Sequence, residues 1–272
     1  MTDFHKKSIQ SLLSEKRLAE AFAELRQTAQ TLQNWQLNNR LDELEESYKY
    51  MIRYVADGCN DPQREEIHNG ITAKLMELAD ITEQELTVQN SPKLYYETLR
   101  MERKYPRSLE ALLEAYRECA DKTALFYELP ADKRDSDQER TLLMEKEKAA
   151  NAVFKHIWVT FPVTADDAGT LDRLFADASA TAEIKELAMA ATMLSLLEHY
   201  SEHLLLSLLD LYAANAFNDA SLSMKALCCA LIAMHCHRET IQHSSAISLR
   251  IANIADSERG RRDIMTVFLQ FI

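Results

Sequence analysis

The chain has 272 residues and a formal net charge of −12, and it contains only 4 Gly and 5 Pro. This length allows a buried core without disulfides or metals, and the scarcity of turn residues excludes an all-β or α/β chain, which needs Gly or Pro at many connections. The negative charge opposes binding to phosphate backbones and to anionic lipid, so we expect neither nucleic acid nor a membrane as a partner.

The N-terminal sequence MTDFHKKSIQSLLSEK lacks the continuous apolar core of a signal peptide. No stretch of the chain reaches the roughly 20 apolar residues that a membrane-spanning helix needs. The cysteines are odd in number and unevenly placed, which suits a reducing compartment better than a disulfide framework. They are Cys59, Cys119, Cys228, Cys229 and Cys236. We therefore expect buried thiols in a cytoplasmic protein.

Apolar residues spaced by three and four predict two amphipathic helices at 18–32 and 37–55. The second helix should end near Gly58, which can adopt the left-handed cap, and the short connection makes the pair an antiparallel hairpin. Further helices are predicted at 62–79, 82–89, 92–104 and 108–123. Thr82 and Glu85 have the spacing of a capping box at the start of the helix at 82–89.

The most polar stretch, LPADKRDSDQ at 129–138, is predicted to be a loop between two halves of the chain. Ser136 and Glu139 have the spacing of a capping box for the helix that follows. The predicted organisation is therefore irregular helical hairpins over residues 1–128 and helical repeats over residues 139–272.

A repeat of 37 residues runs through the second half. It is visible as an apolar quartet that recurs on successive helices, and the fourth copy departs at its first position. The quartets are Ala150, Val153, Phe154 and Ile157; Leu187, Ala190, Ala191 and Leu194; Met224, Leu227, Cys228 and Leu231; and Arg261, Ile264, Met265 and Phe268. The helices between them show the same 37-residue spacing, with apolar or aromatic residues at Phe175, Tyr212 and Leu249. A period of 37 residues made of two helices is typical of α-solenoids.

With this period, residues 146–272 resemble the HEAT and armadillo class of helical repeat proteins in architecture, and the N-terminal hairpins are similar to tetratricopeptide-type packing. The resemblance implies an all-α fold that forms an α-α superhelix, a right-handed solenoid of antiparallel helical hairpins. Such surfaces mostly hold partners, so it also implies a non-enzymatic scaffold for a protein or peptide. The net negative charge of the chain favours a basic partner.

The last repeat is incomplete in this register, because the chain supplies its first helix only. Four apolar side chains on that helix then have no second helix to cover them, namely Phe268, Leu269, Phe271 and Ile272. Since solenoids usually finish with a polar cap, two hypotheses follow. The chain is the N-terminal region of a larger protein, or its last helix pairs with another subunit by self-association.

Residues 199–203, HYSEH, match the inverted zinc-peptidase signature HxxEH. This motif would make His199 and His203 zinc ligands and Glu202 the general base. The alternative function is therefore a metal-binding protein or a zinc-dependent hydrolase. The repeat register places a turn here, with Ser201 able to cap the next helix, whereas an unbroken helix from about 183 to 213 would put both histidines on one face.

The next repeat carries His235, His237 and His243 around the equivalent turn. Because equivalent turns of adjacent repeats stack at about 8–10 Å, His199 and His203 could lie near His235 and His237 and bind zinc or nickel. The favoured interpretation is that His235 and His237 end a helix, whose dipole favours imidazolium there. With no Gly-rich phosphate loop and no GxSxG motif either, we assign no catalytic residue, no metal ligand and no cofactor.

Tyrosines are concentrated in the first half of the chain, where eight of the ten lie between positions 48 and 127. Tyrosine offers apolar area and a hydroxyl group at a small entropic cost, which suits protein-binding surfaces. Tyr50, Tyr54, Tyr95 and Tyr96 lie outside the predicted core stripe. These four are therefore the candidates for an exposed interaction patch, whereas the favoured interpretation of each one singly is ordinary half-buried packing.

Overall fold

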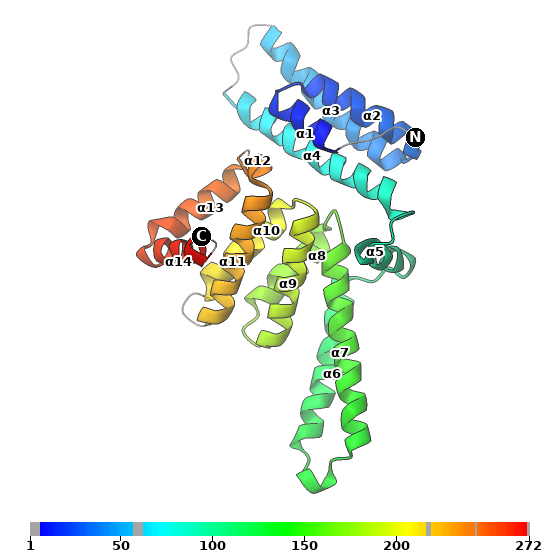
Figure 1. The fold of residues 1–272 in the computed structure, drawn as a ribbon, viewed down its shortest axis with the longest axis vertical. Helices are drawn as coiled ribbons and strands as arrows, with labels where there is room; N and C mark the ends of the chain where they lie inside the picture. The colour runs from blue at the N-terminus through cyan, green and yellow to red at the C-terminus, as the bar shows by residue number, and fades with distance from the viewer. Residues whose placement is uncertain (1–5, 57–61, 216–218, 243, 271–272) are drawn as a thin grey trace. The chain divides into compact units, whose positions relative to one another are not determined.

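The computed structural model describes residues 6–56, 62–215, 219–242 and 244–270. Over these residues the protein is all-helical and contains no strand (Figure 1). The helices are α1 (Lys6–Ser14), α2 (Leu18–Leu32), α3 (Trp35–Ala56), α4 (Arg64–Val88), α5 (Leu94–Lys104), α6 (Leu109–Glu128), the 3₁₀ helix η1 (Ala131–Lys133), α7 (Ser136–Val159), α8 (Ala165–Ala176), α9 (Ala182–Glu198), α10 (Glu202–Asn215), α11 (Ala220–Cys236), α12 (Arg238–Ile241), α13 (Ser245–Asp256) and α14 (Glu258–Gln270).

The chain divides into two compact units. Unit 1 comprises Met1–Tyr96 and His237–Ser248, and unit 2 comprises Glu97–Cys236 and Leu249–Ile272. The polar loop at 129–138 lies inside unit 2, where it contains η1 and joins α6 to α7. The boundary between the units therefore does not coincide with the predicted division at this loop. Polar composition marks a solvent-exposed turn, whichever helices the turn connects.

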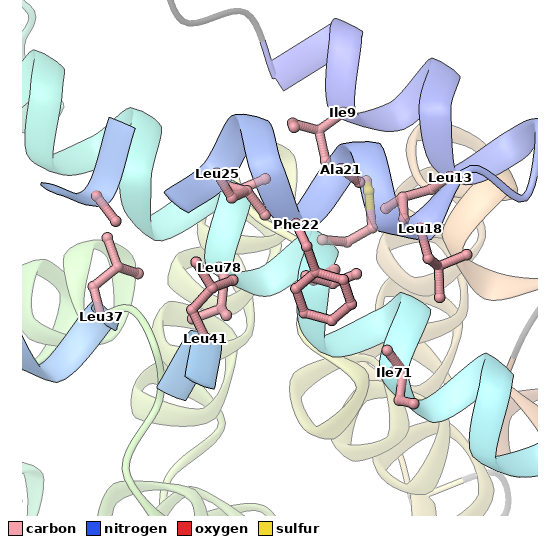
Figure 2. Packing of buried hydrophobic residues seen from close by; sticks show 14 residues of the cluster. Ile9, Leu13, Leu18, Ala21, Phe22, Leu25, Leu37, Leu41, Ile71 and Leu78 are labelled. Atoms are coloured by element: carbon pink, nitrogen blue, oxygen red, sulfur yellow. The ribbon is translucent and has the colours of Figure 1, made fainter. Parts of the chain in front are cut away.

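Unit 1 is built from α1–α4, whose apolar faces meet in one core (Figure 2). The core residues are Ile9, Leu13, Leu18, Ala21, Phe22, Leu25, Ala29, Leu37, Leu41, Ile71, Leu75, Met76, Leu78 and Ala79. The Phe22 ring of α2 also packs against Tyr48 of α3, with ring centroids 5.6 Å apart. The predicted hairpin of α2 and α3 is thus present, and it buries the apolar stripe from which it was predicted.

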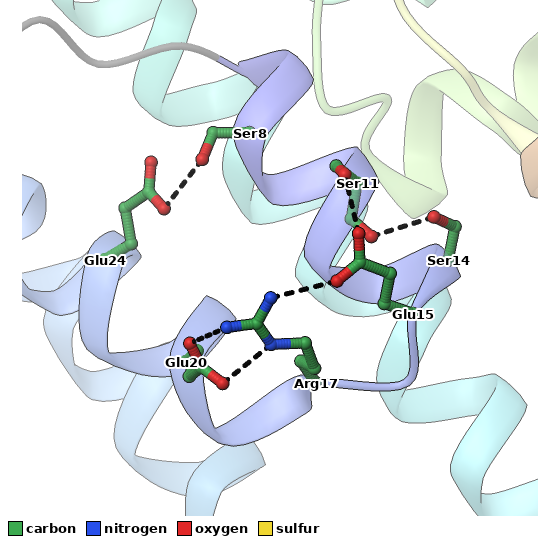
Figure 3. A network of polar contacts seen from close by, with 7 residues as sticks. All are labelled: Ser8, Ser11, Ser14, Glu15, Arg17, Glu20 and Glu24. Carbon is green, nitrogen blue, oxygen red and sulfur yellow. Dashed lines mark hydrogen bonds and ion pairs between the residues drawn. The ribbon is translucent and has the colours of Figure 1, made fainter.

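The turn between α1 and α2 carries a polar network around Arg17 (Figure 3). The Arg17 guanidinium donates to Glu20 Oε1 at 2.8 Å and to Glu15 Oε2 at 2.9 Å, and Ser8 Oγ donates to Glu24 Oε2 at 3.0 Å. The Arg17 bond also lowers the pKa of Glu20. Because this guanidinium is solvent-exposed, the network adds little stability. The sequence pattern did not predict α1, a short helix with only two buried residues.

The predicted helices at 62–79 and 82–89 are one helix, α4 (Arg64–Val88). Thr82 lies inside it, and its hydroxyl donates to the Leu78 carbonyl oxygen at 2.7 Å. The predicted capping box of Thr82 and Glu85 is therefore wrong. A threonine hydroxyl bonds the carbonyl four residues earlier as readily as it caps a helix, so the capping pattern alone does not distinguish the two.

The cap of α7 also differs from the prediction. The N-cap residue is Asp135, whose carboxylate accepts from the Asp137 amide at 3.4 Å, and not Ser136. The carboxylate of Glu139 accepts from the Tyr127 hydroxyl at 2.7 Å. The helix thus begins one residue earlier than its sequence signature indicates, because aspartate and serine cap equally well.

In unit 2, α6 and α7 lie side by side as a long antiparallel pair (Figure 1). Helix α7 also packs against α9, and α9 packs against α11. Helix α10 packs against α8 and α11, and α14 packs against α11. Each odd-numbered helix from α7 to α11 therefore contacts the next one in the series.

Ion pairs join the same helices laterally. Lys146 of α7 binds Glu183 of α9 at 2.6 Å, and Lys225 of α11 binds Glu186 of α9 at 2.7 Å. The ion pair of Arg250 with Asp210 at 2.8 Å joins α13 to α10, and a contact of His203 Nε2 with Asp172 at 3.2 Å joins α10 to α8. All of these pairs are partly exposed, so each contributes at most about 1 kcal/mol.

The buried faces of the repeat helices differ from the predicted quartets. In α7, Ala150, Val153 and Ile157 are buried as expected, but in α9 Ala190 and Leu194 are exposed. The buried face of α9 is instead formed by Ile184, Lys185, Ala188, Met189, Ala191, Thr192, Ser195 and Leu196. Helix α9 has apolar residues on all sides and packs between α7 and α11, so its spacing does not identify one buried stripe.

Candidate functional site

The HYSEH motif lies across a helix break. Helix α9 ends at Glu198 and α10 begins at Glu202. The Leu204 amide donates to Ser201 Oγ at 3.4 Å, which confirms the predicted turn with Ser201 as the cap. His199 and His203 therefore do not share a helical face, and the single-helix geometry that a peptidase motif requires is absent.

The two histidines of the motif have different surroundings. His199 is 5% exposed, and its ring stacks on Phe161 with centroids 4.4 Å apart and planes at 17°. His203 is largely exposed, and its Nε2 lies 3.2 Å from Asp172 Oδ2. The Ser207 hydroxyl donates to the same carboxylate at 2.6 Å. Because the Ser207 hydroxyl donates to the Asp172 carboxylate and to the His203 backbone carbonyl, and not to the imidazole ring, this group lacks the order of a catalytic triad.

The remaining predicted histidines lie at or beyond a helix end. His235 occupies the last turn of α11, as predicted, and is exposed. His237 is the N-cap residue of α12 and belongs to unit 1, whereas His235 belongs to unit 2. His243 lies outside the described residues. In the part of the chain that the structure describes, no three His, Cys, Asp or Glu side chains are arranged to hold a metal ion.

Among the cysteines, Cys229 is not activated as a nucleophile. Burial raises the pKa of the Cys229 thiol to about 11, with a smaller contribution from the neighbouring Cys228. A thiol with this pKa stays protonated at neutral pH and reacts slowly. Cys119 and Cys228 are half-buried, but Cys236 is exposed, which corrects the expectation of buried thiols at that position. Cys59 lies outside the described residues.

The predicted tyrosine patch divides into two pairs. Tyr50 and Tyr54 are 66% and 57% exposed on α3, as predicted. Tyr95 and Tyr96 are 3% and 8% exposed, so the prediction that they are exposed is wrong. Their rings pack edge to face at 5.1 Å, and the side-chain amide of Gln84 donates to the Tyr95 hydroxyl at 2.9 Å. A tyrosine outside an apolar stripe can still be buried when a polar partner satisfies its hydroxyl group.

Helix α14 carries an exposed apolar face. Met265, Phe268 and Leu269 are all more than half exposed and lie within one helical turn of one another, whereas Val267 is buried. The expectation that Phe268 and Leu269 are uncovered therefore holds within this single chain. Phe271 and Ile272 lie outside the described residues.

Sequence reasoning missed a polar cluster made of the buried His156 and the half-buried Glu102 and Asp167. His156 Nε2 lies 3.1 Å from Asp167 Oδ2, and Nδ1 lies 3.6 Å from Glu102 Oε2. Asp167 Oδ1 also accepts from the Leu109 amide at 3.1 Å, at the start of α6. The cluster thus joins α5, α6, α7 and α8. No local motif predicts it, because Glu102 lies 54 residues before His156 and Asp167 lies 11 residues after it, on a different helix.

The cluster does not form a substrate site. The adjoining cavity has a volume of about 10 Å³ and is lined mainly by apolar groups, with Thr160 beside His156. Such a space holds at most one water molecule. The three side chains are therefore best explained as a structural junction, since removal of one partner would leave a buried polar group without its contact.

None of the described helices is both long enough and apolar enough to cross a membrane. Comparisons with known protein families, with curated proteins and with solved structures found no match. Function must therefore be inferred from the residues and their arrangement.

Proposed function

We propose that the protein is a helical-repeat scaffold that binds a basic protein or peptide, and that unit 2 is a stack of two-helix repeats of the α-α superhelix type. The serial packing of α7, α9 and α11 and the packing of α8 against α10 support this proposal. So do the ion pairs that join successive helices, one of which spans the 37-residue period from Lys146 to Glu183. In repeat proteins each hairpin buries its apolar face against its neighbours in this way.

The observation that carries the binding proposal is the exposed face of α3 in unit 1. Tyr50 and Tyr54 lie one helical turn apart, and Glu46 lies one turn before Tyr50. Glu43 is also exposed and lies on the same side of the helix. Tyrosine rings next to carboxylates suit Lys and Arg side chains, which stack on the rings and pair with the acids. We therefore assign the stripe formed by Glu43, Glu46, Tyr50 and Tyr54 as the contact surface for the partner.

Site-specific photo-crosslinking tests this assignment. A photoreactive phenylalanine would replace Tyr50, Tyr54 or, as a control, Tyr105, which is 57% exposed but lies in unit 2. We expect one polypeptide with a Lys- or Arg-rich segment to crosslink from positions 50 and 54 and not from 105. Crosslinking of that polypeptide from all three positions, or from position 105 alone, would contradict the assignment.

The double variant Tyr50→Ala/Tyr54→Ala separates binding from folding. Both side chains are exposed, so the free energy of unfolding should change by less than about 0.5 kcal/mol. Binding of the crosslinked partner should weaken at least about tenfold, which corresponds to about 1.4 kcal/mol. Titration calorimetry measures the affinity, and Tyr105→Ala is the matched control. Unchanged affinity in the double variant would exclude this face of α3.

A further inference from the structure

The first half of α7 has an open face. None of residues 136–149 is buried, and every buried residue of α7 lies at or after Ala150. The loop end of the α6–α7 pair stands clear of the other helices of unit 2 (Figure 1). Over this stretch α7 pairs with α6, as the bond from the Tyr127 hydroxyl to Glu139 shows. Two helices bury only the seam between them, so the opposite face of α7 remains accessible to a partner.

That face carries two apolar side chains between two opposite charges. The spacing of three and four residues places Arg140, Leu143, Met144 and Glu147 on one side of the helix, and we refer to these four residues as the α7 face. All four are exposed, Leu143 by 44% and Met144 by 61%. Neither the Arg140 guanidinium nor the Glu147 carboxylate forms an ion pair with another described residue. A basic group thus precedes the apolar pair, and an acidic group follows it.

The order of charges on the α7 face is complementary to a second, antiparallel copy of itself. The midpoint of the face falls between Leu143 and Met144. Arg140 and Glu147 are equally distant from this midpoint, each about 5 Å away along the helix axis. A two-fold axis through the midpoint therefore places Arg140 of one copy opposite Glu147 of the other, and it generates the reverse pair as well. The apolar side chains of both copies then meet at the centre, between the two ion pairs.

The exposed apolar face of α14 lacks this complementarity. Arg261 and Arg262 precede its apolar residues Met265, Phe268 and Leu269. No acidic residue follows them in the described part of the helix, which ends at position 270. An antiparallel second copy would therefore leave both arginines without an acidic partner. Charge thus favours the α7 face, and not that of α14, as the surface for pairing with a second copy.

We propose that two copies of the chain associate through the α7 face as an antiparallel, two-fold symmetric pair. Two ion pairs between Arg140 and Glu147 fix the register, and the contact of Leu143 with Met144 of the other copy excludes water at the centre. Four side chains from each copy form a smaller interface than a permanent dimer has, so the association is weak and reversible. The proposal does not depend on the contact surface of α3, which lies in unit 1.

Sedimentation equilibrium of the full chain, from micromolar to millimolar concentration, tests the proposal. The ionic strength should be about 0.15 M, where salt screens the repulsion between two acidic chains beyond about 8 Å. We expect a dimer whose fraction rises with concentration. Arg140→Glu or Glu147→Arg alone places like charges opposite each other at both ends of the interface, so each should weaken dimerisation at least about tenfold. A wild-type chain that stays monomeric at millimolar concentration would overturn the proposal.

Exchange of the two charges separates this interface from a general effect of charge. The double variant Arg140→Glu/Glu147→Arg restores opposite charges across the two-fold axis and keeps the net charge, so it should dimerise as the wild type does. An equimolar mixture of the two single variants should form a heterodimer, because one variant then presents two acidic groups and the other two basic groups. A monomeric double variant, or a mixture without heterodimer, would contradict the pairing of Arg140 with Glu147.

The matched control is Glu145→Lys, which changes the net charge as much as Glu147→Arg does. Glu145 is also exposed on α7, but it lies outside the α7 face, so this substitution should leave the dimer affinity unchanged. Circular dichroism should show the same thermal midpoint for all of these variants, since every changed residue is exposed. A dimer that Leu269→Lys abolishes and Arg140→Glu does not would place the interface on α14 and overturn the assignment to α7.

Discussion

At Gly260, neighbouring backbone atoms leave no space for a side chain. It lies in the first turn of α14, where its amide donates to Ser257 Oγ at 2.9 Å. A Cβ atom there would lie 2.0 Å from the Ile254 carbonyl oxygen, which is backbone and cannot rotate away. We expect Gly260→Ala to lower the free energy of unfolding by about 1–3 kcal/mol, as overpacking does. Urea unfolding followed by circular dichroism measures this change.

Gly169 in α8 is the matched control for that substitution. It belongs to unit 2 as Gly260 does, but the nearest atom to its added Cβ is the flexible Arg173 Nη1 at 3.7 Å. Gly169→Ala should therefore stabilise the protein by about 0.5–1 kcal/mol, because alanine loses less backbone entropy in a helix. Stabilisation of the protein by both substitutions would show that helix propensity, and not the contact with Ile254, governs position 260.

At the scale of the helix, α8 and α9 both begin with a threonine N-cap but use it differently. Thr164 Oγ1 accepts from the Asp167 amide at 3.1 Å, whereas Thr181 makes no such bond. Thr164→Ala should therefore destabilise the protein by about 1 kcal/mol, and Thr181→Ala by less than about 0.5 kcal/mol. Chemical unfolding of the two variants checks the difference. Equal losses would mean that Thr181 caps α9 in solution.

At the scale of the whole molecule, the net charge of −12 should control how a partner associates. A basic partner is attracted from a distance, and salt screens that attraction over about 10 Å at 0.1 M ionic strength. We expect the association rate of the partner crosslinked at α3 to fall several-fold as salt rises to that concentration, with a much smaller change in the dissociation rate. Stopped-flow or surface-plasmon measurements test this expectation. An association rate independent of salt would contradict a basic partner.

The sequence by itself determined the all-α class and most helix positions. The pattern at 18–32 matches α2, and the patterns at 92–104 and 108–123 identify α5 and α6. These predictions succeeded because helix periodicity and the scarcity of Gly and Pro act within a few residues along the chain. The turn at Ser201 could be predicted for the same reason, since a cap is a local hydrogen bond.

Only the tertiary structure decided which faces are buried and which side chains meet. Tyr95 and Tyr96 are buried although local spacing indicated exposure, and Leu194 is exposed although it was predicted to lie in the core. The junction around His156 combines residues from several helices. Burial and side-chain contacts depend on neighbours that are distant in sequence and close in space. A pattern within one helix carries no information about those neighbours.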